Sequence, residues 1–183
     1  MNILTTIFPI YDFARTVAGD HADVSMLLPP GAESHTYEPT PRDILKIQNA
    51  DLFIYIGGES DMWVDQILSS LGDKKPRTLV LIHSVNALPE EVVPGMQAEE
   101  ESPTSGEAEV VYDEHIWTSP LNAIKMVDAI TVALSELDPA HAADFENNRA
   151  ALDQKFQELD QTFRDIVKTA KRKTIIVGDR FPF

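Results

Sequence analysis

Histidine is the residue type with the clearest chemical potential in this sequence. The chain has five histidines and no cysteine, so a bound metal would have to be held by imidazole and carboxylate groups. His35 stands in a loop just before a helix start, and His115 follows Asp113 and Glu114 just before another. Imidazole suits zinc and tolerates manganese. One loop histidine is weak support for a site, however, because sites need several convergent groups.

The remaining candidate side chains give weaker signals. Glu59 follows two glycines in a loop, where it is either a metal ligand or a solvated carboxylate. His21 is expected at the surface, His83 in polar packing at a strand end, and His141 at the start of a long helix.

The hydrophobic pattern predicts the elements that must position these groups. Runs rich in apolar and β-branched residues predict strands, and apolar residues at helical spacing predict the helices between them. The expected strands are 3–8, 24–28, 52–56 and 77–82. Strands that alternate with helices at this spacing indicate an α/β domain with a parallel four-stranded sheet. Ligands bind at the carboxyl ends of strands in such folds, so a site is expected in loops at that sheet edge.

Capping residues place the helix starts. Thr40 is a good N-cap, and Pro41 suits the first helical position that follows it. Ser60 is expected to cap a third helix that ends at Gly72. Ser119 is expected to cap a fourth helix, which runs to Pro139.

A long helix is predicted over residues 140–170. Its apolar positions form a narrow stripe: Phe145, Leu152, Phe156, Leu159, Phe163, Ile166 and Ala170. This spacing by itself is typical of a coiled-coil arm. A short strand over residues 174–177 is expected to follow.

Charge and composition exclude several function classes. The formal net charge of −15 argues against nucleic acid and anionic membrane surfaces as partners, and it is compatible with cationic ligands. No run reaches the roughly 18–20 apolar residues of a membrane span. Residues 89–112 are acidic, contain Pro and Gly, and predict a mobile loop, with weak cation gathering as an alternative role.

Two segments carry a resemblance to a known family. The strings HTYEPTPRDI and ADLFIYIGGE, at 35–44 and 50–59, resemble the first metal-site segment of the zinc/manganese substrate-binding proteins of bacterial ABC importers. The string DEHIWTSPLNA, at 113–123, resembles the second, with the form D-x-H-x-W-x-x-P. The resemblance covers nearly all of this chain but only the first part of a typical member.

The resemblance implies a domain division and a set of ligands. Residues 1–138 would form an N-terminal α/β metal-binding lobe, 139–172 a helix that links two lobes, and 173–183 the first strand of a truncated second lobe. His35 and His115 would be ligands that lie close together at one sheet edge, with Glu59 as a further candidate. Where the family usually has a histidine after that strand, Asp179 is the nearby donor.

Supporting groups and processing are implied as well. Glu38 and Asp113 are expected to accept hydrogen bonds that orient the histidines. The predicted strand at 3–8 leaves no export signal before it, and the resemblance implies that such a signal was removed.

The function implied by the resemblance is capture of Zn(II) or Mn(II) outside the cytoplasm and delivery to an ABC transporter permease. Contact with the membrane would be only through a lipid anchor or the permease. An adhesion or scaffold module with a structural metal is one alternative, and a zinc hydrolase is another. The hydrolase needs a general base and an open metal position, and the sequence has no HExxH motif.

Overall fold

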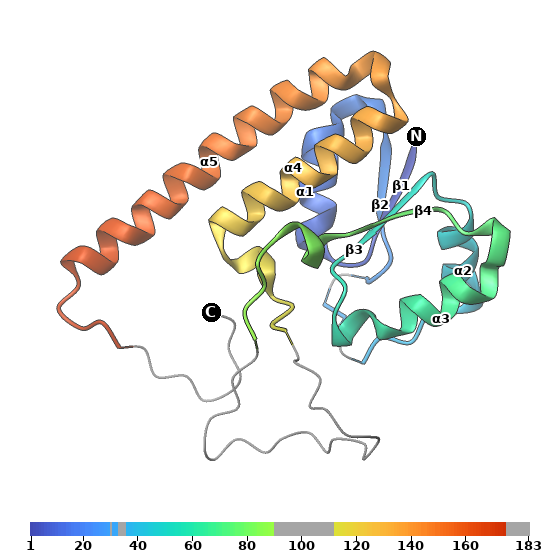
Figure 1. Ribbon diagram of the computed structural model, residues 1–183, viewed down its shortest axis with the longest axis horizontal. Coiled ribbons are helices and arrows are strands. Elements are labelled where there is room, and N and C mark those ends of the chain that lie inside the picture. Colours follow the sequence, from blue (N-terminus) through green and yellow to red (C-terminus); the bar gives the residue numbers. More distant parts are fainter. Residues whose placement is uncertain (30, 33–35, 90–111, 175–183) are drawn as a thin grey trace.

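The computed structural model describes residues 1–29, 31–32, 36–89 and 112–174 of the chain. Four strands and five α-helices alternate through most of this part, with short 3-10 turns between them (Figure 1). The strands are β1 (Asn2–Thr5), β2 (Asp23–Met26), β3 (Leu52–Tyr55) and β4 (Arg77–Val80). The α-helices are α1 (Phe8–Ala18), α2 (Pro41–Gln48), α3 (Met62–Leu71), α4 (Pro120–Leu137) and α5 (Ala142–Thr169).

The sheet is parallel throughout, with the strand order β2-β1-β3-β4. The chain leaves β1 toward one side for β2 and crosses to the other side for β3. The carboxyl ends of β1 and β3 therefore lie where the direction of winding reverses, which is where open α/β sheets bind ligands. The sequence-based expectation of a four-stranded parallel sheet is confirmed.

Side chains of the central strands alternate between two apolar cores. Ile3 packs on one face of the sheet and Leu4 on the other. In β3, Leu52 and Ile54 belong to the core beneath α1, α4 and α5, whereas Phe53 and Tyr55 belong to the core beneath α2 and α3. The result is a three-layer sandwich with its sheet in the middle (Figure 1).

Helix α5 extends past the sheet at its C-terminal end (Figure 1). Phe145 near its start is fully buried, and Phe156 packs edge-on against Phe13 of α1 with ring centroids 5.4 Å apart. Further along, Phe163 and Ile166 are 48% and 58% exposed. The predicted stripe is therefore covered only along its first half by the described part of the chain.

Several predicted boundaries differ from the structure. Strand β4 ends at Val80, and a 3-10 turn at Leu81–Ser84 takes the place of its predicted end. A 3-10 turn at Glu59–Asp61 precedes α3, so the expectation that Ser60 caps this helix is wrong. The strand expected at 174–177 and the predicted mobility near 89–112 fall almost wholly outside the described residues, and the domain division stays a prediction.

Candidate metal-binding site

The segment that carries His115 is attached to the carboxyl end of β3. The carboxylate of Glu114 accepts a hydrogen bond from the backbone N–H of Ser60 (3.0 Å) and a second from the Ser60 hydroxyl. The same segment is also attached to the chain beyond the end of β4, because the Asp113 N–H donates to the carbonyl of Leu88 (2.8 Å). His115 therefore lies at the sheet edge where the sequence places a ligand site.

The ring of His115 is oriented by its neighbour Asp113. The Asp113 Oδ1 atom lies 2.9 Å from Nδ1 of the ring and also 2.9 Å from the backbone nitrogen of His115. The Trp117 ring lies beside the imidazole, with centroids 5.3 Å apart. The expectation that Asp113 orients His115 is confirmed. Because Nδ1 faces a carboxylate, Nε2 is the nitrogen with which this ring would coordinate a metal.

A second carboxylate, which sequence reasoning missed, fixes the loop after β3. Asp61 Oδ2 accepts hydrogen bonds from the backbone N–H groups of Ile56 (2.9 Å) and Gly57 (3.1 Å). Burial raises the pKa of Asp61 to about 6 against the effect of these two donors, and the charge of Glu114 adds to the rise.

The other predicted ligands are not brought together within the described residues. Glu59 is exposed at the start of the 3-10 turn before α3. His35 and Asp179 lie outside the described residues. Within the described ranges, no three His, Asp or Glu side chains converge in a way that could hold a metal ion. The proximity predicted for His35 and His115 therefore stays a prediction.

The start of α2 carries a cluster of polar side chains. Thr40 and Asp43 form the predicted N-cap as a reciprocal capping box, and Lys46 pairs with Asp43 at 3.1 Å. The Tyr37 ring packs against Trp63, with centroids 5.5 Å apart. Burial, followed by the effects of nearby Asp43, raises the pKa of Tyr37 to about 12. Glu38 is exposed, and its predicted orienting role stays a prediction because His35 lies outside the described residues.

Two other histidines form a stacked pair away from this edge. The rings of His21 and His141 lie 3.9 Å apart, between the turn before β2 and the turn before α5. His141 Nδ1 contacts Asp138 at 2.6 Å, and His21 Nε2 contacts Asp144 at 3.1 Å. Each ring has its own carboxylate, and the pair makes a packing contact between the start of α5 and the end of α1. His21 was expected at the surface, but its side chain is only 30% exposed because it packs against His141.

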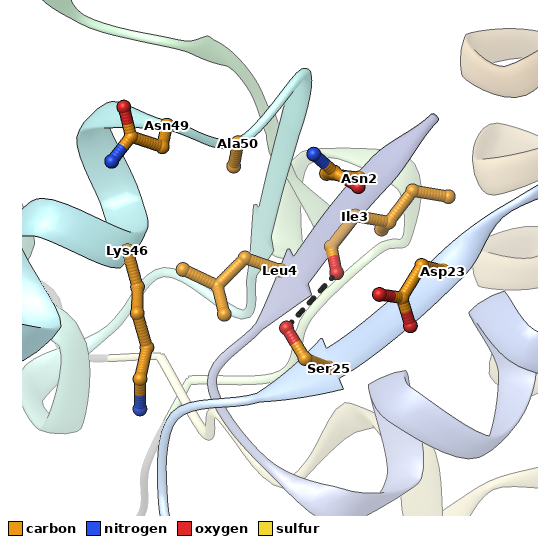
Figure 2. Close-up of a pocket in the computed structure, with 8 residues that line it drawn as sticks. All are labelled: Asn2, Ile3, Leu4, Asp23, Ser25, Lys46, Asn49 and Ala50. Atoms are coloured by element: carbon orange, nitrogen blue, oxygen red, sulfur yellow. Dashed lines mark hydrogen bonds between the residues drawn. The ribbon is translucent and has the colours of Figure 1, made fainter.

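Two shallow hollows mark the opposite ends of the sheet. Figure 2 shows the first, of about 230 Å³, between the starts of β1 and β2 and the end of α2. Its Ser25 hydroxyl donates to the Ile3 carbonyl (3.5 Å), and its one amine, on Lys46, is paired with Asp43. The second hollow, also about 230 Å³, is lined by Asp113, His115 and Asn122 among others, and this one lies at the candidate site.

Comparison with known proteins identifies the family. The model of the family described as zinc-uptake complex component A, periplasmic, matches residues 3–181. The chain belongs to this family. The resemblance on which the sequence analysis rests is therefore confirmed.

Individual relatives give the extent of the match. The chain is 37% identical over 178 residues to the zinc-binding lipoprotein AdcA of Streptococcus pneumoniae, which covers 96% of this chain and 34% of the relative. It is 33% identical over 178 residues to the high-affinity zinc uptake system protein ZnuA of Bacillus subtilis, covering 96% of this chain and 54% of that protein. This chain thus spans only about a third to a half of these relatives.

A solved structure agrees with the fold. The crystal structure of the Zn(II)-bound ZnuA-like domain of Streptococcus pneumoniae AdcA matches with a TM-score of 0.76 and 36% identity. The match covers 93% of this chain and 57% of that chain. Within the described ranges, no helix is both long enough and apolar enough to cross a membrane.

Proposed function

We propose that this chain is part of an extracytoplasmic solute-binding protein that captures Zn(II) and delivers it to an ABC transporter permease. Family membership supports the class of protein, and the names of the relatives support zinc as the cargo. The proposal also fits the net charge of −15, which favours a cationic ligand over nucleic acid.

The observation that carries the proposal is the geometry around His115. Its imidazole stands at the carboxyl edge of the sheet, with Nδ1 set against a carboxylate at 2.9 Å. This carboxylate–histidine arrangement fixes the ring and makes Nε2 a better metal ligand. His35 is proposed as the second imidazole ligand, and Asp179 and Glu59 as candidate carboxylate ligands.

Zinc is the first choice of cargo and manganese the second. The two relatives described above, which are 37% and 33% identical to this chain, are both named for zinc. A set of two histidines and Asp179 would be harder than a three-histidine set, and it would move the preference toward manganese. Competition between Zn(II) and Mn(II) for binding to the purified protein would show which ion it prefers.

A binding role without catalysis is proposed over a zinc hydrolase. Family membership favours a solute-binding protein. An adhesion or scaffold module with a structural metal is the other alternative, and metal-dependent binding to the cognate permease would distinguish a transport role from it. Attachment to the membrane is proposed to occur through a lipid anchor, as the lipoprotein name of one relative suggests.

Zinc titration against a competing chelator tests the proposal. The His115→Ala variant should lose at least about tenfold in affinity, because one ligand is removed. The His21→Ala variant is the matched control, since that ring also faces a carboxylate but lies away from the site. Equal zinc affinity of the wild type and His115→Ala would rule out the site.

A further inference from the structure

A buried carboxylate joins two loops beside the candidate ligand. Glu114 is 9% exposed, and its carboxylate receives both the backbone N–H and the hydroxyl of Ser60, 54 residues earlier. Burying a charged group is costly unless hydrogen bonds replace its water. These two bonds therefore favour one arrangement of the loops over others. We refer to this pair as the Glu114–Ser60 latch.

The loop on the Ser60 side of the latch is itself fixed. Asp61 binds the backbone N–H groups of Ile56 and Gly57, which holds the loop against the end of β3. Gly58, with φ of 150°, lies directly under the Glu114 side chain. A Cβ atom at Gly58 would stand 2.5 Å from Glu114 Oε2, so the absence of a side chain here lets the carboxylate approach.

The latch acts on the residue that follows it in the chain. Asp113 and Glu114 precede His115 directly, and they have different partners. Asp113 contacts the ring of His115 and sets its orientation. Glu114 contacts the loop after β3 and sets where the backbone of His115 lies relative to the sheet edge.

We propose that the Glu114–Ser60 latch positions His115 for metal binding. This inference rests on the proposed function, and it adds two positioning residues to the site. Glu114 acts through its hydrogen bonds to Ser60 and not as a ligand. Metal affinity depends on ligands held close to the productive geometry, so a loosened His115 backbone lowers affinity while all ligands are retained.

Zinc affinity of three latch variants in the full 183-residue chain tests the proposal. The Glu114→Ala variant should lose about tenfold, the usual range for groups that support a ligand. The Ser60→Ala variant should show a smaller loss, because the Ser60 backbone N–H still donates. The Glu114→Gln variant retains an acceptor oxygen without the charge, so its affinity should lie nearer to the wild type than that of Glu114→Ala.

A matched control and a double variant make the test specific. Ser84 is also half-buried near the sheet edge, and its hydroxyl donates to the Leu81 carbonyl at 2.6 Å. The Ser84→Ala variant should bind zinc as the wild type does. The Ser60→Ala/Glu114→Ala double variant should bind no more weakly than Glu114→Ala, because the two single changes break the same contact. The visible absorption of bound Co(II) should change in the latch variants but not in Ser84→Ala.

Three outcomes would overturn the inference. Unchanged affinity in Ser60→Ala together with a loss in Glu114→Ala would assign Glu114 a charge or ligand role. Equal losses of zinc affinity in Glu114→Gln and Glu114→Ala would also assign Glu114 a charge or ligand role. Additive losses of affinity in the double variant would lead to the same conclusion. If Glu114→Ala fails to fold, Ser60→Ala, which retains the carboxylate, decides the question. Unaltered zinc binding in His115→Ala would instead overturn the proposed function.

Discussion

Two of the carboxylate–imidazole pairs in the described part of the chain share a geometry but not a location. Asp113 faces His115 at 2.9 Å at the sheet edge that forms the candidate site. Asp138 faces His141 at 2.6 Å beside the start of α5. The hydrogen bond from His141 lowers the pKa of Asp138. A carboxylate beside an imidazole is therefore not sufficient to indicate a metal site. The position of the pair relative to the strand ends decides which one is a candidate for metal binding.

This difference leads to a prediction about Asp113. The Asp113→Ala variant should bind zinc about tenfold more weakly, because His115 loses the acceptor that orients its ring. The Asp138→Ala variant removes an equivalent acceptor from His141 and should leave zinc affinity unchanged. Titration of both variants against a competing chelator checks this. Equal losses in the two variants would indicate a general effect of negative charge.

The sequence predicted the partner of His115 but not the partner of Ser60. Asp113 is two residues from the histidine it orients, so local sequence was enough. Ser60 precedes an apolar helical run, and this pattern is typical of an N-cap. In the structure its hydroxyl goes to Glu114 instead, 54 residues away. A distant acceptor leaves no trace in local spacing. The partners of Asp61 are the nearby backbone N–H groups of Ile56 and Gly57, and backbone donors have no residue type that a sequence pattern could indicate.

Helix α2 shows how local sequence can fix an element beside the site. The Thr40 hydroxyl and the Asp43 carboxylate cap the helix reciprocally. Burial raises the pKa of Asp43, but the hydrogen bonds from Thr40 and Lys46 outweigh this effect and lower the pKa to about 2. The N-cap Thr40 was readable in the sequence because its partner Asp43 lies within one turn of the chain.

The lowered pKa predicts how stability changes with pH. The pKa of Asp43 falls from its ordinary 3.8 to about 2, so its charged form stabilises the fold above pH 3.8. This contribution, at most about 2 kcal/mol, is lost as the pH falls through 2. The Asp43→Asn variant should therefore be less stable than the wild type at pH 7, with the difference shrinking between pH 4 and pH 2. Urea unfolding at several pH values measures this, and a constant difference would contradict it.

Helix α5 has two halves with different surroundings. The heptad-like spacing predicted one continuous stripe, but only the first half packs against α1 and α4. The sequence could indicate the helix and its apolar face from their period. It could not indicate which part of that face is covered, because this depends on where α1 and the sheet end in space.

A pair of substitutions on α5 tests this division. Phe156 contacts Phe13, so Phe156→Ala should lower the free energy of unfolding by about 2 kcal/mol. Phe163 is 48% exposed, and Phe163→Ala should change the free energy of unfolding by less than about 0.5 kcal/mol. Denaturant unfolding of the two variants gives the comparison. Similar losses for both would mean that the second half of α5 is covered in solution.

At the scale of the whole molecule, the parallel sheet brings together loops that are far apart in the sequence. Alternating strands and helices predicted its architecture, while the strand order came from the structure. Strand ends were predicted too long, because apolar residues continue into 3-10 turns such as Leu81–Ser84. His35 and Asp179 lie outside the described residues, so the complete ligand set is still a prediction.

The net charge of −15 leads to a prediction about binding kinetics. A strongly negative protein attracts Zn(II) over distances of about a Debye length, roughly 10 Å at 0.1 M salt. The association rate should therefore fall several-fold between low and high salt, while the dissociation rate changes less. Stopped-flow measurement of zinc binding at a series of salt concentrations gives both rates.

Variants in which surface carboxylates are neutralised separate the effect of the overall charge on zinc binding from the effect of the site itself. Changing Glu90, Glu91, Glu99, Glu100 and Glu101 to glutamine would reduce the formal charge from −15 to −10 without changing a proposed ligand. Association at low salt should become slower and its dependence on salt weaker, because the long-range attraction is smaller. The equilibrium affinity at high salt should match that of the wild type, since screening removes the contribution of these charges. An unchanged salt dependence would show that the acidic segment does not gather cations, and a loss of affinity at high salt would mean that these glutamates bind zinc directly.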